Sequence, residues 1–209
     1  MTRWLMLMSF VLAGVQPAVK KAIPAPAVPA DAPSYTADGQ MKFPADYREW
    51  VFLTSGLDMS YNPKATAATH SVFNNIFVNP SAYRVFVKTG TWPEGTMIML
   101  EHRGAEGNHS INVRGLTQAQ DVTGTEIHVK DSAHMKGGWA FYNFKDTGSA
   151  KLIERPAACY TCHEEHAAVD TTFVQFYPTL MDVAKAKGVL SAAYLKEIEA
   201  KTAPAEGGK

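Results

Sequence analysis

The chain has very little cysteine, because Cys159 and Cys162 are the only two among its 209 residues. Any cysteine chemistry therefore involves this one pair. The chain also lacks an excess of charge of either sign, since 20 Lys and Arg residues balance 20 Asp and Glu residues. This balance gives no electrostatic reason to expect a nucleic acid or an anionic membrane as partner. The composition, with 46% hydrophobic and 19% charged residues, is typical of a globular domain that binds a small or neutral partner.

Long apolar runs are also missing. The run at residues 4–15 follows a single positive charge at Arg3 and precedes small residues. About a dozen apolar residues are too few for an ordinary transmembrane helix and are typical of a secretory signal peptide. We therefore predict a signal peptide over residues 1–18 and an exported, periplasmic location in a bacterium. An uncleaved N-terminal anchor is the alternative, because two lysines follow closely, and we expect no other stable membrane insertion.

What the chain does contain is the sequence Cys159-Tyr160-Thr161-Cys162-His163. This Cys-X-X-Cys-His pattern is typical of c-type haem attachment. Each thiol adds to a vinyl group of the haem to form a thioether, and the histidine that follows is placed as a ligand of the iron. We therefore predict one covalent haem c, bound by Cys159 and Cys162, with His163 as the proximal ligand. Export agrees with this prediction, because the attachment takes place outside the bacterial cytoplasm.

Three other roles for the cysteine pair stay open. A thioredoxin-like redox pair needs a strand ending at the pair within a βαβ pattern, and residues 155–158 do not supply it. A zinc site needs two further ligands, for which His163 and His166 are available. A structural disulfide between Cys159 and Cys162 is the third. The complete motif favours haem.

The order of the remaining segments predicts the domain organisation. A Pro- and Ala-rich tether is expected over residues 19–40, the haem domain over 41–201 and a flexible tail over 202–209. Runs of apolar and β-branched residues predict strands at 71–78, 96–100, 110–113, 126–130 and 139–144.

Turn and helix signals lie between these strands. Ser55 and Gly56 predict a turn, and Asn79-Pro80 predicts the start of a helix that ends at Gly90. Further helices are expected around the cysteine motif, at 170–177 with a bend at Pro178, and at 190–201. The predicted fold class is α+β, mainly β, with a curled antiparallel sheet and flanking helices around one covalently attached haem.

Short segments between residues 43 and 180 match, in order and spacing, a pattern found in one family. The segments are residues 47–50, 79–83, 88–96, 129–131, 138–141, 159–163 and 173–178. Together they resemble the cytochrome P-460 family, which shares its fold with cytochrome c′-beta. The resemblance implies an antiparallel β fold, often a homodimer, with one c-type haem, His163 as its only protein ligand and an open sixth site. It also implies nitrogen-oxide chemistry, namely hydroxylamine oxidation in one branch and nitric oxide binding in the other.

This chain departs from the hydroxylamine-oxidising branch at one position. In that branch a lysine also cross-links to the porphyrin, and its place falls in the strand at residues 97–101, which here contains no lysine. The nearest lysines by sequence are Lys88, Lys130 and Lys136. The cross-link, and with it the enzymatic interpretation, is therefore weakened.

Chemistry at the open site then depends on the groups that line it. Glu101 would accept protons from a bound hydroxylamine, and Arg103 would stabilise negative charge. The alternative is that residues 101–106 are a solvated strand end. The other histidines are expected at the surface, at positions 70, 109, 128, 134 and 166.

These observations give one main hypothesis and one rival. The chain is expected to bind or oxidise small nitrogen species such as nitric oxide or hydroxylamine. A redox partner protein is also expected. If it is an enzyme, it is a haem oxidoreductase of the hydroxylamine-oxidising type. The rival is an electron-transfer cytochrome without catalytic activity, in which Met135 or Met181 closes the sixth site.

Overall fold

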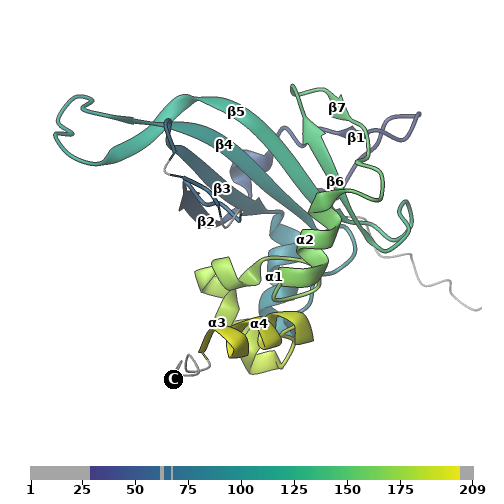
Figure 1. Cartoon of the computed structure of the whole chain (residues 1–209). Coiled ribbons are helices and arrows are strands. Elements are labelled where there is room, and N and C mark those ends of the chain that lie inside the picture. The colour runs from purple at the N-terminus through teal and green to yellow at the C-terminus, as the bar shows by residue number, and fades with distance from the viewer. Residues whose placement is uncertain (1–28, 62–63, 67, 203–209) are drawn as a thin grey trace, which may run out of the picture.

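A five-stranded antiparallel sheet forms the centre of the molecule. The computed structural model describes residues 29–61, 64–66 and 68–202. The strands are β2 (Val51–Leu57), β3 (Val72–Val78), β4 (Met97–Gly107), β5 (Leu116–Lys130) and β6 (Trp139–Phe144). They lie in the order β2-β3-β4-β5-β6, so strands that follow one another in the chain are also neighbours. The fold is α+β and mainly β, with an open, strongly curved sheet (Figure 1).

Alternation along the strands gives the sheet two different faces. On the first, which we call the helix face, the residues that pack with the helices include Leu53, Val78 and Ile98. On the second, which we call the Glu101 face, a separate core contains Met41, Tyr47, Trp50, Met97, Met99, Ile127, Val129, Ala140, Tyr142 and Phe144. This second core is covered by the short pair β1 (Met41–Lys42) and β7 (Ser149–Ala150) and by the 3-10 turn Tyr47–Glu49.

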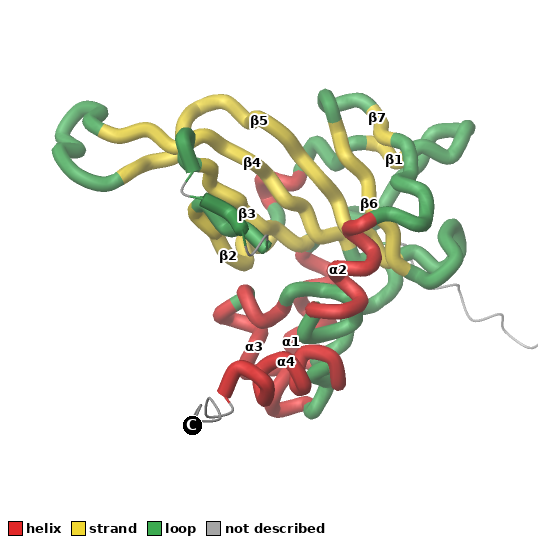
Figure 2. The backbone as a smooth tube through the Cα atoms, viewed as in Figure 1, coloured by secondary structure: helices red, strands yellow, loops and turns green. Residues whose placement is uncertain are grey.

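The described residues form four α-helices, which lie together on the side of the helix face, with α4 packed on α2 and α3 on α1 (Figure 2). They are α1 (Pro80–Thr89), α2 (Ala158–His166), α3 (Pro178–Lys187) and α4 (Ala192–Thr202). Helix α1 starts at Pro80, where a missing N–H costs nothing, and ends at Gly90, whose φ of 76° is left-handed. Both signals were predicted. Pro178 starts α3 in the same way, so the helix predicted through residues 170–177 is instead a 3-10 turn, Val174–Phe176, followed by a new helix.

Two local predictions about the sheet were wrong. The turn predicted at Ser55 and Gly56 lies inside β2, where these residues pair with β3. The strand predicted at residues 110–113 is instead the loop of a long ribbon formed by β4 and β5. The ribbon extends away from the core (Figure 1), and its ladder continues to the pair Gly107 and Leu116. Backbone pairing stabilises this ribbon, and its side chains follow no apolar alternation. The sequence pattern therefore does not predict its strands.

The folded part starts before the expected residue 41. The Asn79 amide donates to the carbonyl of Asp31 at 3.1 Å, and the Tyr35 hydroxyl donates to Asp131 Oδ2 at 2.9 Å. Residues 31–40 of the predicted tether are thus in contact with the domain. The predicted signal peptide and residues 203–209 of the predicted tail lie outside the described residues. Within the described part of the chain, no helix has the length and apolar character needed to cross a bilayer.

Candidate functional site

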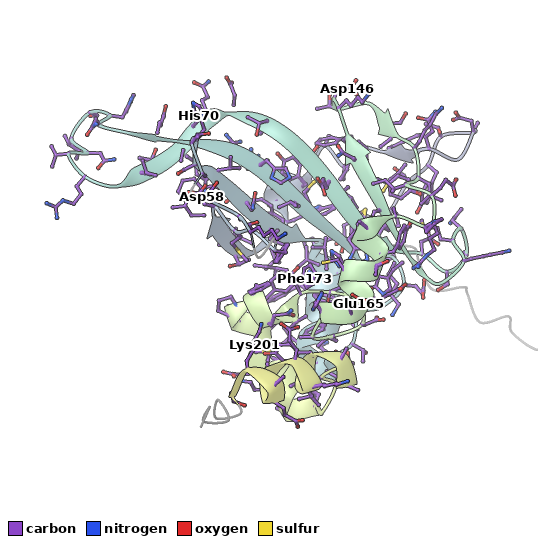
Figure 3. All side chains as sticks on the ribbon, in the orientation of Figure 1. Asp58, His70, Asp146, Glu165, Phe173 and Lys201 are labelled. Atoms are coloured by element: carbon purple, nitrogen blue, oxygen red, sulfur yellow. The ribbon has the colours of Figure 1, made fainter. Side chains whose placement is uncertain are left out.

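A cavity of about 290 Å³ lies against the helix face of the sheet. Its lining comes from all five strands, from α2 and from the segment at 173–177. The walls are largely apolar, with Ile76, Ile98, Leu100 and Phe141 on the sheet. Phe173, which lies between the sheet and the helices in Figure 3, also lines the cavity. Such a lining favours a largely apolar ligand.

His163 projects from α2 into the wall of this cavity. Its Nδ1 lies 2.7 Å from the carbonyl oxygen of Thr171. A carbonyl can only accept, so Nδ1 donates the proton and Nε2 is left as the nitrogen able to bind a metal. Burial lowers the pKa of His163, which favours the neutral ring that metal ligation needs. Phe173 and Phe141 enclose the ring, with centroids 4.1 and 4.7 Å away.

The two cysteines are positioned by the same helix. Cys159 and Cys162 are three residues apart on α2 and therefore project from the same side of it. Both are partly exposed and neither is in a disulfide, so the structural disulfide weighed as an alternative is not formed. Burial, as the largest contribution, raises the pKa of the Cys162 thiol. Two accessible thiols followed by a half-buried neutral histidine are what covalent haem attachment requires.

The zinc alternative finds no support in the part of the chain that the structure describes. No group of three or more His, Cys, Asp or Glu side chains there is arranged to hold a metal ion. The additional ligand would be His166, but its Nδ1 faces Glu197 Oε2 at 3.1 Å. His163 keeps Nε2 free, but the described residues place no further ligand beside it and the cysteine pair. The set of four ligands that a structural zinc site needs is therefore incomplete there.

His128 lines the cavity but was expected at the surface. Only 6% of it is exposed, and its ring stacks on Phe141 with centroids 4.1 Å apart and planes 4° from parallel. Burial holds the pKa of His128 well below its usual range, so the ring is neutral. Its Nε2 is buried without a protein partner. The signal that could have found it is its cross-strand pairing with Phe141, because an aromatic pair indicates a covered face.

Glu101 and Arg103, the predicted distal pair, lie together but away from the cavity. Arg103 Nε donates to Glu101 Oε1 at 2.7 Å. Because side chains alternate along β4, Ile98 and Leu100 line the cavity while the Glu101 carboxylate lies on the opposite face. This alternation is the physical reason why the distal role expected for the pair does not fit the geometry.

The Glu101 carboxylate is also fully engaged where it lies. Its side chain is completely buried and accepts hydrogen bonds from the Tyr47 hydroxyl at 2.6 Å and the Asn75 amide at 3.0 Å. Arg48 supplies a second ion pair beside Arg103. A buried carboxylate with this set of donors is a structural centre rather than a free base.

The ionisable groups that do line the cavity are His102, Glu126, His128 and His163, together with the phenols of Tyr61 and Tyr177. Glu126 is the one carboxylate among the described lining residues, and its side chain is 47% exposed. Its closest ionic partner is His102, with Nε2 to Oε1 at 3.6 Å. No lysine is found in this described lining.

The site as a whole fits a haem group. The cavity supplies apolar walls, a neutral histidine with one free ring nitrogen and two accessible thiols on the same helix. The orphaned Nε2 of His128 adds a buried polar atom that a bound group could satisfy. These features come from residues between β2 and the turn after α2.

The same stretch carries the similarity to known proteins. A comparison with family models matches residues 44–174 to cytochrome P-460. The matched segment includes all five strands of the central sheet, the cysteine motif and Thr171. A comparison with curated proteins finds no match. The chain therefore belongs to the cytochrome P-460 family, as its sequence resemblance predicts, and membership of a cytochrome family implies that it is a haem protein.

Proposed function

We propose that this chain is an exported c-type cytochrome that binds or oxidises small nitrogen species at a single covalent haem. Cys159 and Cys162 would hold the haem through thioethers, and His163 Nε2 would ligate the iron. A haem iron with an open sixth position supplies ligand binding and one-electron chemistry. The observation that carries the proposal is His163, whose neutral ring is fixed through Nδ1 in the wall of an apolar cavity.

The residues of the chain would perform three tasks. The apolar side chains Ile98, Leu100 and Phe141 exclude water from the site. Glu126 can accept a proton that hydroxylamine loses on oxidation, because it is the carboxylate of the described lining. His128 can hydrogen-bond to a bound group through its otherwise unpartnered Nε2. A base in the cavity wall favours turnover over simple capture.

Haem attachment is tested on protein matured in a host with c-type haem assembly. The mass of the purified chain should exceed that of the processed polypeptide by one haem, and the haem should stay attached in acid and denaturant. The double variant Cys159→Ser, Cys162→Ser should lose the covalent attachment. A colourless wild-type protein with the bare polypeptide mass would end the proposal.

The reaction is tested on the same matured protein. Nitric oxide or carbon monoxide should shift the Soret band of the ferrous form, which requires an accessible sixth site. Hydroxylamine oxidation with an artificial electron acceptor should fall about 10²- to 10⁴-fold in Glu126→Gln. The matched control is Glu106→Gln, at an exposed carboxylate of the β4–β5 ribbon. A Soret shift without any hydroxylamine turnover would assign the chain to ligand binding rather than oxidation.

One observation favours the electron-transfer alternative. Met59 lines the cavity and packs on Gly56, where an added Cβ would lie 2.2 Å from its sulfur. Met135 belongs to the core on the Glu101 face and Met181 packs against the helix-face core, so neither thioether is among the cavity lining. Ligation by Met59 would close the sixth site. Six-coordinate low-spin spectra in both redox states, converted to high spin by Met59→Leu, would support this alternative.

Export, a redox partner protein and a homodimer complete the proposal. Export is supported by the N-terminal charge and apolar run. The N-terminal sequence of the periplasmic protein tests it, with a new terminus near residue 18 expected. Sedimentation of the matured protein tests the homodimer.

A further inference from the structure

The carbonyl that holds His163 belongs to an unusual turn. Asp170 and Thr171, just after α2, both have left-handed backbone conformations, with φ of 45° and 58°. Residues with side chains are uncommon there, and a β-branched threonine is especially disfavoured. Such a conformation persists only where surrounding contacts impose it. The contacts that impose it therefore decide where the Thr171 carbonyl lies.

Lys130, at the end of β5, makes the main polar contact with this turn. Its ammonium donates to Asp170 Oδ2 at 2.6 Å and to the carbonyl of Trp92 at 3.0 Å. The lysine side chain is 21% exposed, so the ion pair is partly shielded from water. Lys130 therefore links Asp170 and the Trp92 backbone to the end of β5.

Trp92 holds the other side of the same turn. Its indole Nε1 donates to Thr172 Oγ1 at 2.8 Å, and that hydroxyl donates to the carbonyl of Val169 at 2.6 Å. Val169 and Thr172 also form a β-bridge across the turn. Lys130 and Trp92 thus hold Asp170 and Thr172, the two neighbours of Thr171, whose carbonyl accepts the His163 proton.

We propose that Lys130 is a positioning residue for His163. Its ion pair with Asp170 fixes the Thr171 carbonyl on His163 Nδ1 and so sets how strongly the imidazole donates electron density to a bound iron. The physical basis is that a hydrogen bond at the second ring nitrogen orients a ligating histidine and raises its basicity. This inference rests on the proposed function, because it requires His163 to be the iron ligand.

The test uses the matured haem protein with Lys130→Met and Asp170→Asn. Either change removes the ion pair, and Asn tolerates the left-handed conformation of residue 170. The weaker hydrogen bond should lower the ferrous iron–histidine stretching frequency in resonance Raman spectra. It should also shift the ferric/ferrous equilibrium toward ferrous by up to about tenfold, the lower end of the effects of such outer partners. Lys130→Arg should retain both wild-type values.

The matched control is Lys185→Met, which removes the exposed Lys185–Asp182 pair on α3 and should change neither value. The inference is overturned if Lys130→Met and Asp170→Asn also leave both values as in wild type. If Lys130→Met does not mature, Asp170→Asn and Lys130→Arg decide the question. A wild-type protein without an iron–histidine band would instead refute the proposed function, so the two failures are distinguishable.

Discussion

Two buried ionisable side chains, one on each face of the central sheet, have opposite surroundings. On the Glu101 face the buried carboxylate has Tyr47, Asn75 and two arginines as partners. On the helix face the buried Nε2 of His128 has no protein partner. A polar group with all its partners stabilises a fold, whereas an unpartnered one beside a cavity is available to a ligand. The comparison teaches that chemistry is to be sought where polar atoms lack partners, not where charges are most concentrated.

The largest expected effect comes from breaking the Glu101 cluster. Glu101→Gln removes the negative charge that compensates Arg48 and Arg103. The Arg103 side chain is only 14% exposed, so water compensates its charge poorly. Loss of one member of a buried ion cluster should cost about 3 kcal/mol or more of unfolding free energy. Urea unfolding measures this cost. The haem spectrum of the folded fraction should be unchanged; a changed spectrum with wild-type stability would place Glu101 in the site after all.

A smaller loss is expected from Tyr47→Phe on the same face. The change removes the hydroxyl that donates to Glu101 Oε2 at 2.6 Å and leaves the ring packing in place. A hydrogen bond to a charged group is worth about 1.5–3 kcal/mol. The midpoint of urea unfolding, at unchanged slope, reports the loss. A loss below about 0.5 kcal/mol would mean that the carboxylate does not depend on this donor.

The sequence predicted the parts of the site that local chemistry determines. Cys159, Cys162 and His163 lie together on one helix, with His163 at the cavity, as their spacing predicts, and their role in haem attachment stays a proposal. Asn79-Pro80 starts a helix, as its local signature predicts. The assignment of Glu101 to the cavity failed because it depends on which face of β4 the helices cover. Helix α2, which lies more than fifty residues later, brings the cysteine motif to that face. The same long-range choice buries His128, so neither result could be read from neighbouring residues.

On the helix face, His128→Phe should raise stability while it perturbs the surroundings of His163. Phenylalanine keeps the stacking on Phe141 and removes the unpartnered nitrogen, whose desolvation costs about 1–3 kcal/mol. Unfolding free energy should rise by about 1 kcal/mol, after some loss from the larger ring. The Soret band of the haem protein should shift, because the His128 ring lies 4.8 Å from the ring of His163, the proposed iron ligand. The control is His70→Phe, at an exposed position that is not among the described cavity lining and is labelled in Figure 3. This change should alter neither the unfolding free energy nor the Soret band. A destabilised His128→Phe would show that Nε2 is satisfied within the fold.

The smallest stability effect is expected at Glu126. Its side chain is 47% exposed and its closest ionic partner, His102 Nε2, is 3.6 Å away. Exposed pairs of this kind contribute at most about 1 kcal/mol, so Glu126→Gln should cost less than about 0.5 kcal/mol in urea unfolding. Any turnover of hydroxylamine should nevertheless fall, because the carboxylate lines the cavity. The contrast between the two faces therefore predicts that Glu126 affects the reaction but not stability, and that Glu101 affects stability but not the reaction. Equal unfolding costs for Glu126→Gln and Glu101→Gln would remove the distinction between the two faces.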